Sequence, residues 1–255
     1  MSKLAEFILP TLLIAVFLVA PTISSVKASP DIVFSDALDG NVSSSGTAAA
    51  GTPGIAVGDA PGNIYWRGFF KFSLSGVSGT LSSARMYVYV FYSLLNGVQD
   101  LTDPLDNPGL GDCQVIHIDD YGTLDSGDFN APSIGNDPGI LVSGSATPNI
   151  GYLSIDVKAA MQDDINKGRS FSSFMIKMAT DTDIDNLYDY WSFGASESAG
   201  TAGVPPYIEY DRAPAAVGGV FVPVNKLTIL APYLALVGLV GAVTVVFATK
   251  RRRKT

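Results

Sequence analysis

The sequence predicts an all-β fold, an antiparallel jelly-roll β-sandwich with one short helix, plus a C-terminal transmembrane helix. Many short segments rich in β-branched and aromatic residues alternate with clusters of Gly, Pro, Asn and Asp, which is typical of such a sandwich. An uncharged apolar stretch near the end predicts the transmembrane helix. We expect five parts: a signal peptide at 1–28, a β-sandwich ectodomain at 29–212, a linker at 213–226, a transmembrane helix at 227–249 and a basic tail at 250–255.

The N-terminal segment has the pattern of a cleaved secretory signal. Lys3 precedes an apolar run, and small residues then lead to Ala28, after which we expect cleavage. The alternative is an uncleaved N-terminal anchor. That reading needs about 20 apolar residues, more than this run provides.

The C-terminal segment has the pattern of a single membrane span. Residues 227–249 contain no charged side chain, and residues 250–254 are all Lys or Arg. Cations beside a span stay on the cytoplasmic side. We therefore expect a single-pass protein of the cell membrane, with its N-terminal domain outside the cytoplasm and its C-terminus inside.

The middle of the chain contains seven segments with strand character, and one with helical spacing. The helix is expected at Lys158–Lys167, where Gly168 follows in the position favoured after a helix end. Residues 43–62 are rich in small and turn residues and indicate a loop or a weak edge strand. The strands are expected at residues 65–74, 84–92, 115–118, 151–157, 171–178, 190–193 and 206–210.

The charge balance of the ectodomain excludes some partners. Residues 30–212 contain 23 Asp and Glu against 8 Lys and Arg, whereas the whole chain has a net charge of −8. Nucleic acid and anionic lipid are therefore poor partners for this domain.

Cys113 is the only cysteine, so no intramolecular disulfide forms, and we expect a buried thiol rather than an intermolecular bridge. Asn41 begins the only glycosylation sequon.

Several segments together resemble a known family. These are residues 67–74 continuing into 83–90, then 153–157, 192–198 and 205–210. In order and spacing they are similar to the disaggregatase-related (DNRLR) domain, also classed as carbohydrate-binding module family 96. The resemblance implies a jelly-roll sandwich of surface and secreted proteins, some of which bind acidic or neutral polysaccharides. It also aligns Arg67 and Glu197 with paired family positions, which we interpret as a structural ion pair.

A second resemblance concerns the C-terminal part. Residues 223–233 are similar to the anchors of archaeal surface proteins, which implies an archaeal envelope.

Three closely spaced carboxylates form a candidate metal site. Asp181, Asp183 and Asp185 alternate with other residues, a spacing that lets a loop fold them around Ca²⁺. The helix-loop-helix calcium motif is excluded because Asn186 replaces its glycine and Ser192 its final glutamate. The alternative interpretation is a solvated acidic loop without metal.

An aromatic group provides a candidate sugar-binding surface. Tyr188, Tyr190 and Trp191 lie within four residues, and Trp66 adds a ring from another strand. Aromatic rings stack on the apolar faces of sugars, while their polar atoms contact the hydroxyls. The competing interpretation is that these rings belong to the sandwich core.

Catalytic signals are weak, so three functions are carried forward. His117 is the only histidine, and no nucleophile elbow accompanies it, so we predict no catalytic residue. We expect a non-catalytic cell-surface protein that binds polysaccharide or glycan. The first alternative is a structural envelope protein that associates with itself or a surface layer. The second is a polysaccharide-degrading enzyme, because glycosidases need only two carboxylates.

Overall fold

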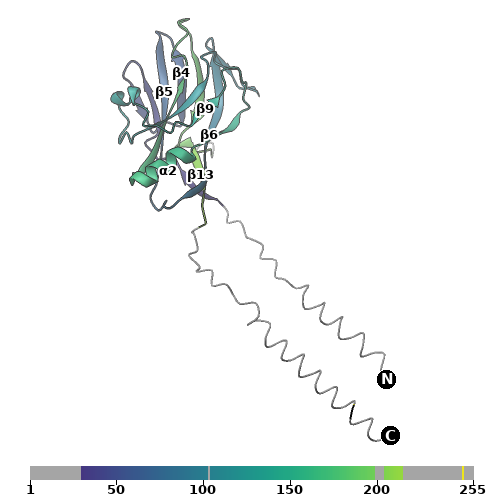
Figure 1. Ribbon diagram of the computed structural model, residues 1–255. Helices are drawn as coiled ribbons and strands as arrows, with labels where there is room; N and C mark the ends of the chain where they lie inside the picture. The colour runs from purple at the N-terminus through teal and green to yellow at the C-terminus, as the bar shows by residue number, and fades with distance from the viewer. Residues whose placement is uncertain (1–29, 103, 199–203, 215–248, 250–255) are drawn as a thin grey trace. The chain divides into compact units, whose positions relative to one another are not determined.

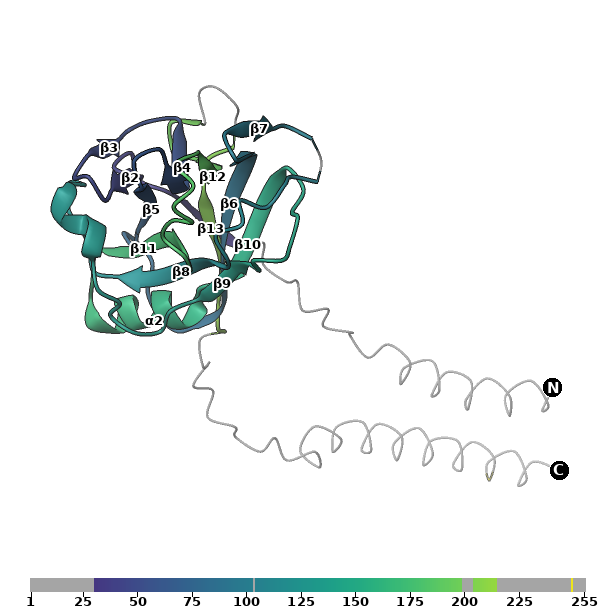
Figure 2. The same cartoon turned by 90° about the horizontal axis from the view of Figure 1, so that it is seen from above.

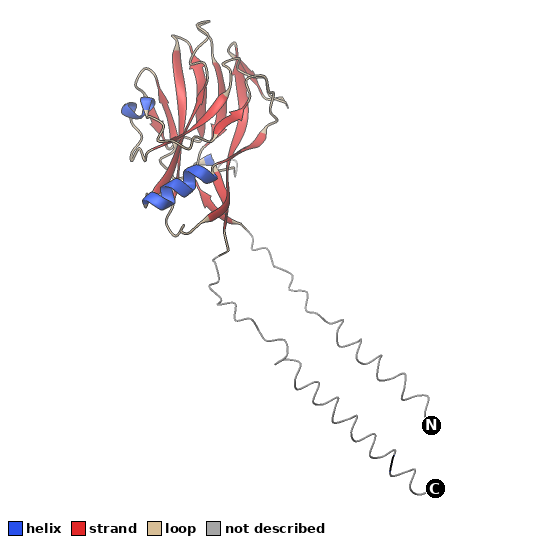
Figure 3. Cartoon of the chain, in the orientation of Figure 1, coloured by secondary structure: helices blue, strands red, loops and turns tan. Residues whose placement is uncertain are grey.

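The computed structural model describes residues 30–102, 104–198, 204–214 and 249. The chain divides into two compact units, Met1–Ala213 and Pro214–Thr255. The described strands and helices lie in the first unit, which is a mainly antiparallel β domain with the helix α2 (Figures 1 and 3).

Thirteen strands, one α-helix and one 3₁₀ helix have defined bounds in the described residues. In chain order they are β1 (Asp31–Phe34), β2 (Gly40–Ser43), β3 (Ala48–Ala50), β4 (Gly54–Ala60), β5 (Ile64–Ser73), β6 (Leu81–Leu95), β7 (Val98–Asp100), β8 (Cys113–Ile118), η1 (Ser126–Asn130), β9 (Gly139–Val142), β10 (Gly151–Asp156), α2 (Lys158–Lys167), β11 (Phe171–Met178), β12 (Asp189–Gly194) and β13 (Tyr207–Arg212).

The strands form one hydrogen-bonded antiparallel sheet that curls around the core. Its main path runs β1-β13-β6-β12-β4-β5-β11-β8-β9. The long strand β6 pairs with β13 through residues 81–87 and with β12 through residues 90–94. Strand β6 therefore links β13 to β12 in the path of the sheet. After β1, an isolated bridge from Ser35 to Phe72 joins the start of the path to β5.

The main core lies inside the curl and follows the two-residue period of the strands. Along β6, Met86, Val88 and Val90 are completely buried, and Phe70 and Phe72 of β5 join them. Burying each such side chain contributes about 1.5–3 kcal/mol relative to leaving it exposed.

A second, smaller core covers the opposite face of β5. Phe69 packs there with Val42 of β2 and Phe129 of η1, and Figure 2 shows η1 on the side of β2 and β3. Lys71 on the same face is only 3 % exposed, and its Nζ donates to Asp120 Oδ1 at 3.2 Å. Both faces of β5 are therefore covered.

Helix α2 has the bounds that the sequence predicts. It ends at Gly168, whose φ of 68° is the left-handed conformation that glycine adopts without a steric penalty. The helix lies across one end of the strands and packs against β6 and β11 (Figure 3).

The predicted fold class is wrong in its transmembrane helix. No helix within the described residues is both long enough and apolar enough to cross a membrane. Helix α2 has ten residues and spans only about 15 Å, half of a hydrocarbon core. The fold class is corrected to a curled antiparallel sheet with one helix. The predicted span at 227–249, apart from residue 249, lies outside the described residues, as do the signal peptide at 1–28 and the tail at 250–255.

The segment 43–62 is more ordered than its composition suggests. It contains β3 and the seven-residue strand β4, which lies between β12 and β5. Glycine is required at position 58 of β4, because a Cβ there would lie 2.1 Å from the carbonyl oxygen of Asp189.

Candidate functional site

An aromatic surface covers the outer side of four adjacent strands. Directly paired residues of antiparallel strands point to the same face. Phe34 of β1 pairs with Tyr207 of β13, Tyr207 pairs with Tyr87 of β6, and Tyr89 of β6 pairs with Tyr152 of β10. We call these five residues the tyrosine face.

The rings of the tyrosine face contact one another. Tyr87 and Tyr207 stack with centroids 4.7 Å apart, and Tyr152 meets Tyr89 and Tyr207 edge-on at 5.2 Å each. Tyr152 is 40 % exposed and Phe34 is 57 % exposed. Their packing fixes the rings in place without removing them from solvent, which suits a binding surface.

Two hydroxyl groups of this face, those of Tyr152 and Tyr207, are protonated at neutral pH. Burial raises the pKa of Tyr152 and Tyr207 above the usual value of a tyrosine. The Tyr152 hydroxyl donates to the carbonyl oxygen of Pro205 at 3.1 Å. The face thus combines ring surfaces with polar atoms that can donate and accept hydrogen bonds.

A row of charged residues borders the tyrosine face. Arg85 of β6 pairs directly with Glu209 of β13 on one side and Asp156 of β10 on the other. Its guanidinium also donates to the hydroxyl of Ser154 at 3.2 Å. The charges are confined to this border, so the centre of the face is uncharged.

The predicted sugar-binding group is divided by the structure. Trp191 is completely buried and stacks with Phe193 in the main core, so its ring is not available to a ligand. This part of the prediction is wrong, because Trp191 occupies the inward position of β12. Tyr188 is 46 % exposed and contacts Tyr190 edge-on. The pairing places Tyr190 and Trp66 at the same level, on either side of Gly58.

The three aspartates predicted to bind metal have different surroundings. Asp181 forms an ion pair with Arg67 at 3.3 Å, so Arg67 is paired with Asp181 and not with Glu197 as expected. Asp185 Oδ1 accepts the backbone N–H of Leu187 at 2.7 Å. Asp183 alone of the three joins a carboxylate cluster.

That cluster consists of Asp59, Asp183 and Asp189. One carboxylate oxygen from each lies within 4.8 Å of the others. Asp59 and Asp189 face each other directly in the pairing of β4 with β12, and they are 1 % and 0 % exposed. Burial raises the pKa of both, and the neighbouring carboxylates Asp183 and Asp185 raise it further. The sequence did not indicate Asp59 or Asp189 as neighbours of Asp183.

The predicted glycosylation site is enclosed by strands. Asn41 is 5 % exposed and lies in β2, between β3 and β5. The folded domain has no room for a glycan on this side chain, because the sequon forms part of the sheet instead of a surface loop.

The only histidine belongs to a buried polar network. His117 Nε2 lies 3.0 Å from Asp164 Oδ2, and its Nδ1 lies 2.7 Å from the carbonyl oxygen of Gly135. Asp164 also accepts hydrogen bonds from Arg169 and Ser172. Burial opposes the charged imidazole, but these hydrogen bonds raise the pKa of His117. The group is fully hydrogen-bonded, which favours a structural role.

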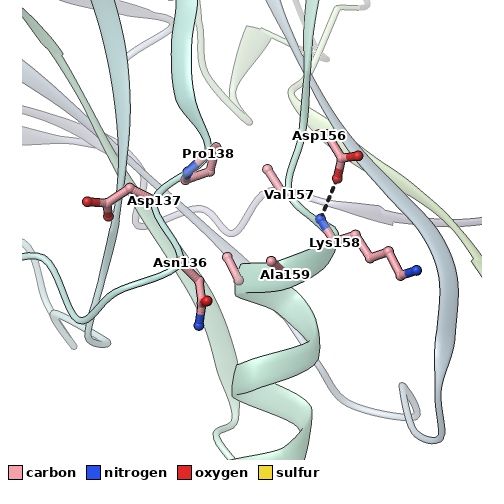
Figure 4. Close-up of a pocket in the computed structure, with 8 residues that line it drawn as sticks. Asn136, Asp137, Pro138, Asp156, Val157, Lys158 and Ala159 are labelled. Carbon is pink, nitrogen blue, oxygen red and sulfur yellow. Dashed lines mark hydrogen bonds between the residues drawn. The ribbon is translucent and has the colours of Figure 1, made fainter.

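A shallow hollow lies beside the first turn of α2 (Figure 4). Asn136, Asp137 and Pro138 form one wall, and residues 156–160 form the other. Its acidic groups already accept hydrogen bonds. Asp156 accepts the backbone N–H of Lys158 at 2.9 Å, and Asp137 accepts the hydroxyl of Ser133 and the backbone N–H of His117. The hollow therefore offers no converging pair of free carboxylates.

No family model matches the chain, and no curated protein is significantly similar to it.

Proposed function

We propose that the β domain is a non-catalytic glycan-binding module of the cell surface, and that it holds a polysaccharide on the tyrosine face. The observation that carries this proposal is the set of five packed aromatic rings on the outer side of β1, β13, β6 and β10. These rings lie outside a sheet whose inward residues already form a complete core. Their packing therefore serves the surface rather than the interior.

The chemistry of the face favours an uncharged glycan. Sugar rings stack on tyrosines, and tyrosine hydroxyls exchange hydrogen bonds with sugar hydroxyls. The centre of the face is uncharged, and the described domain carries an excess of carboxylates that repels polyanions. The resemblance to a family with polysaccharide-binding members is consistent with this proposal.

A matched pair of variants tests the proposal. In a screen of the full-length chain against neutral and acidic polysaccharides, we expect saturable binding to a neutral one. Tyr152→Ala should lower that affinity about tenfold or more, which corresponds to about 1.4 kcal/mol. Tyr188→Ala removes a similarly exposed tyrosine outside the tyrosine face and should leave the affinity unchanged. The opposite result would move the binding surface to the Tyr188, Tyr190 and Trp66 group.

A structural envelope protein is the second candidate, and one observation favours it. Strand β1 begins the path of the sheet, and Ile32 and Phe34 on it are 52 % and 57 % exposed. An edge strand with exposed apolar side chains can pair with another copy of the chain. Concentration-dependent association that Phe34→Ser abolishes, without binding to any polysaccharide, would support this function instead.

A further inference from the structure

We infer that Asp59, Asp183 and Asp189 form a Ca²⁺ site that joins β4, β12 and the loop between β11 and β12. The three carboxylates supply one oxygen each within 4.8 Å of one another. Two oxygens on opposite sides of Ca²⁺ are separated by about 4.8 Å, because each Ca–O distance is about 2.4 Å. The separation therefore allows one ion to contact all three groups.

Two buried carboxylate oxygens without partners support a bound cation. Asp59 Oδ1 and Asp189 Oδ2 are buried and have no hydrogen-bond partner. The second oxygen of each carboxylate is engaged: Asp59 Oδ2 accepts the N–H of Asp183 at 3.3 Å, and Asp189 Oδ1 accepts the N–H of Asn96 at 2.6 Å. These bonds orient the carboxylates and leave one oxygen on each for a ligand. Buried carboxylate oxygens without a partner are costly, and a cation removes that cost.

The charges of the cluster are not balanced by the protein. Within the described residues, no Lys, Arg or His lies within ion-pair distance of Asp59, Asp183 or Asp189. Asp181 in the same loop differs from these three residues, because it forms an ion pair with Arg67. Three carboxylates at this separation repel one another unless they are protonated or share a cation.

The ligand set selects the type of metal. All three side chains offer carboxylate oxygens, the hard ligands that Ca²⁺ and Mg²⁺ prefer, and the cluster contains no imidazole or thiolate. Ca²⁺ accepts irregular geometry and six to eight oxygens, whereas Mg²⁺ requires a nearly ideal octahedron at about 2.1 Å. A site assembled from two strands and a loop suits Ca²⁺ better.

The site would fasten the loop to the sheet. Asn186, in the same loop, already accepts the N–H of Gly62 in the turn between β4 and β5 at 2.7 Å. An ion held by Asp183 adds a second link, from the loop to β4 and β12. This inference does not depend on glycan binding.

Calcium titration of the full-length chain tests the site. After treatment with a chelator and its removal, we expect saturable uptake of one Ca²⁺ by calorimetry, a rise in Tm of several degrees, and weaker binding of Mg²⁺. Asp189→Asn and Asp183→Asn should each lower the affinity for Ca²⁺ about tenfold or more. Because Asp183 is exposed, its variant keeps the test valid even if Asp189→Asn fails to fold.

Two control variants locate the site. Asp106→Asn removes a charge from an exposed loop and should leave Ca²⁺ binding unchanged. Asp181→Asn should also leave it unchanged, which separates this cluster from the set Asp181, Asp183 and Asp185. Absence of Ca²⁺ binding by the unaltered chain, or affinity retained in both Asp183→Asn and Asp189→Asn, would overturn the inference.

Discussion

Replacement of Trp191 by alanine should greatly lower the free energy of unfolding of the domain, and it should not remove a ligand contact. Trp191 is completely buried and packs on Phe193 in the main core. Truncating a buried tryptophan costs about 3–5 kcal/mol, through lost transfer free energy and the cavity left behind. The total stability of such domains is about 5–15 kcal/mol. For a domain of this size, Tm should fall by roughly 6–20 °C.

A conservative variant separates packing from the indole N–H. Trp191 Nε1 is buried and has no hydrogen-bond partner, so tryptophan gains nothing from its polar atom here. Trp191→Phe removes that unpaired donor and leaves a smaller cavity. We therefore expect it to cost much less than Trp191→Ala, about 1 kcal/mol.

Denaturant unfolding followed by circular dichroism measures both effects. If Trp191→Ala lowers the free energy of unfolding by less than about 1 kcal/mol, the indole is not a core residue and the placement of β12 is wrong. A loss of glycan binding in this variant would carry information about the site only if the variant is shown to be folded.

Three further predictions follow from buried polar groups. Burial raises the pKa of Asp39 to about 7, and the charge of Glu197 adds to the rise. The folded state therefore binds this proton more tightly than the unfolded state. The free energy of unfolding should be highest below about pH 4 and should fall as pH rises toward about 7. Asp39→Asn should flatten this dependence in thermal melts between pH 4 and 8. Asp164→Ala leaves His117 and Arg169 without their shared acceptor and should cost about 3–5 kcal/mol by urea unfolding, whereas an effect below 1 kcal/mol would contradict the network. Asn41 should carry no glycan in the folded protein, so intact mass should not differ between the unaltered chain and Asn41→Gln beyond the substitution itself.

Local sequence patterns located helix α2 and seven of the thirteen described strands. The strand at Phe171–Met178 and the helix at Lys158–Lys167 have the predicted bounds, because alternation and a glycine stop are local signals. Residues 54–60 are interpreted from the sequence as part of a loop or a weak edge strand, whereas β4 lies between β12 and β5. Its Gly58 lacks β propensity but is needed there, because a Cβ would meet the backbone of β12.

The candidate sites were harder to predict because they depend on pairing between distant segments. Tyr190 and Trp191 are neighbours in sequence, and only the pairing of β12 decides which of them faces the core. Likewise, Asp59 and Asp189 meet across β4 and β12, so spacing along the chain identified Asp183 but not its two partners. The tyrosine face is similar: Tyr87 and Tyr89 lie in the strand predicted at residues 84–92, but their contacts with Tyr152 and Tyr207 come from two other strands.

The most direct test of glycan binding on the tyrosine face is the affinity of the full-length chain for a neutral polysaccharide. Calorimetry would measure it for the unaltered protein, Tyr152→Ala, Tyr152→Phe and Tyr188→Ala. We predict a loss of about tenfold or more in Tyr152→Ala, a smaller loss in Tyr152→Phe, which keeps the ring, and no change in Tyr188→Ala. Equal affinity of Tyr152→Ala and the unaltered chain, or no binding to any polysaccharide, would contradict it.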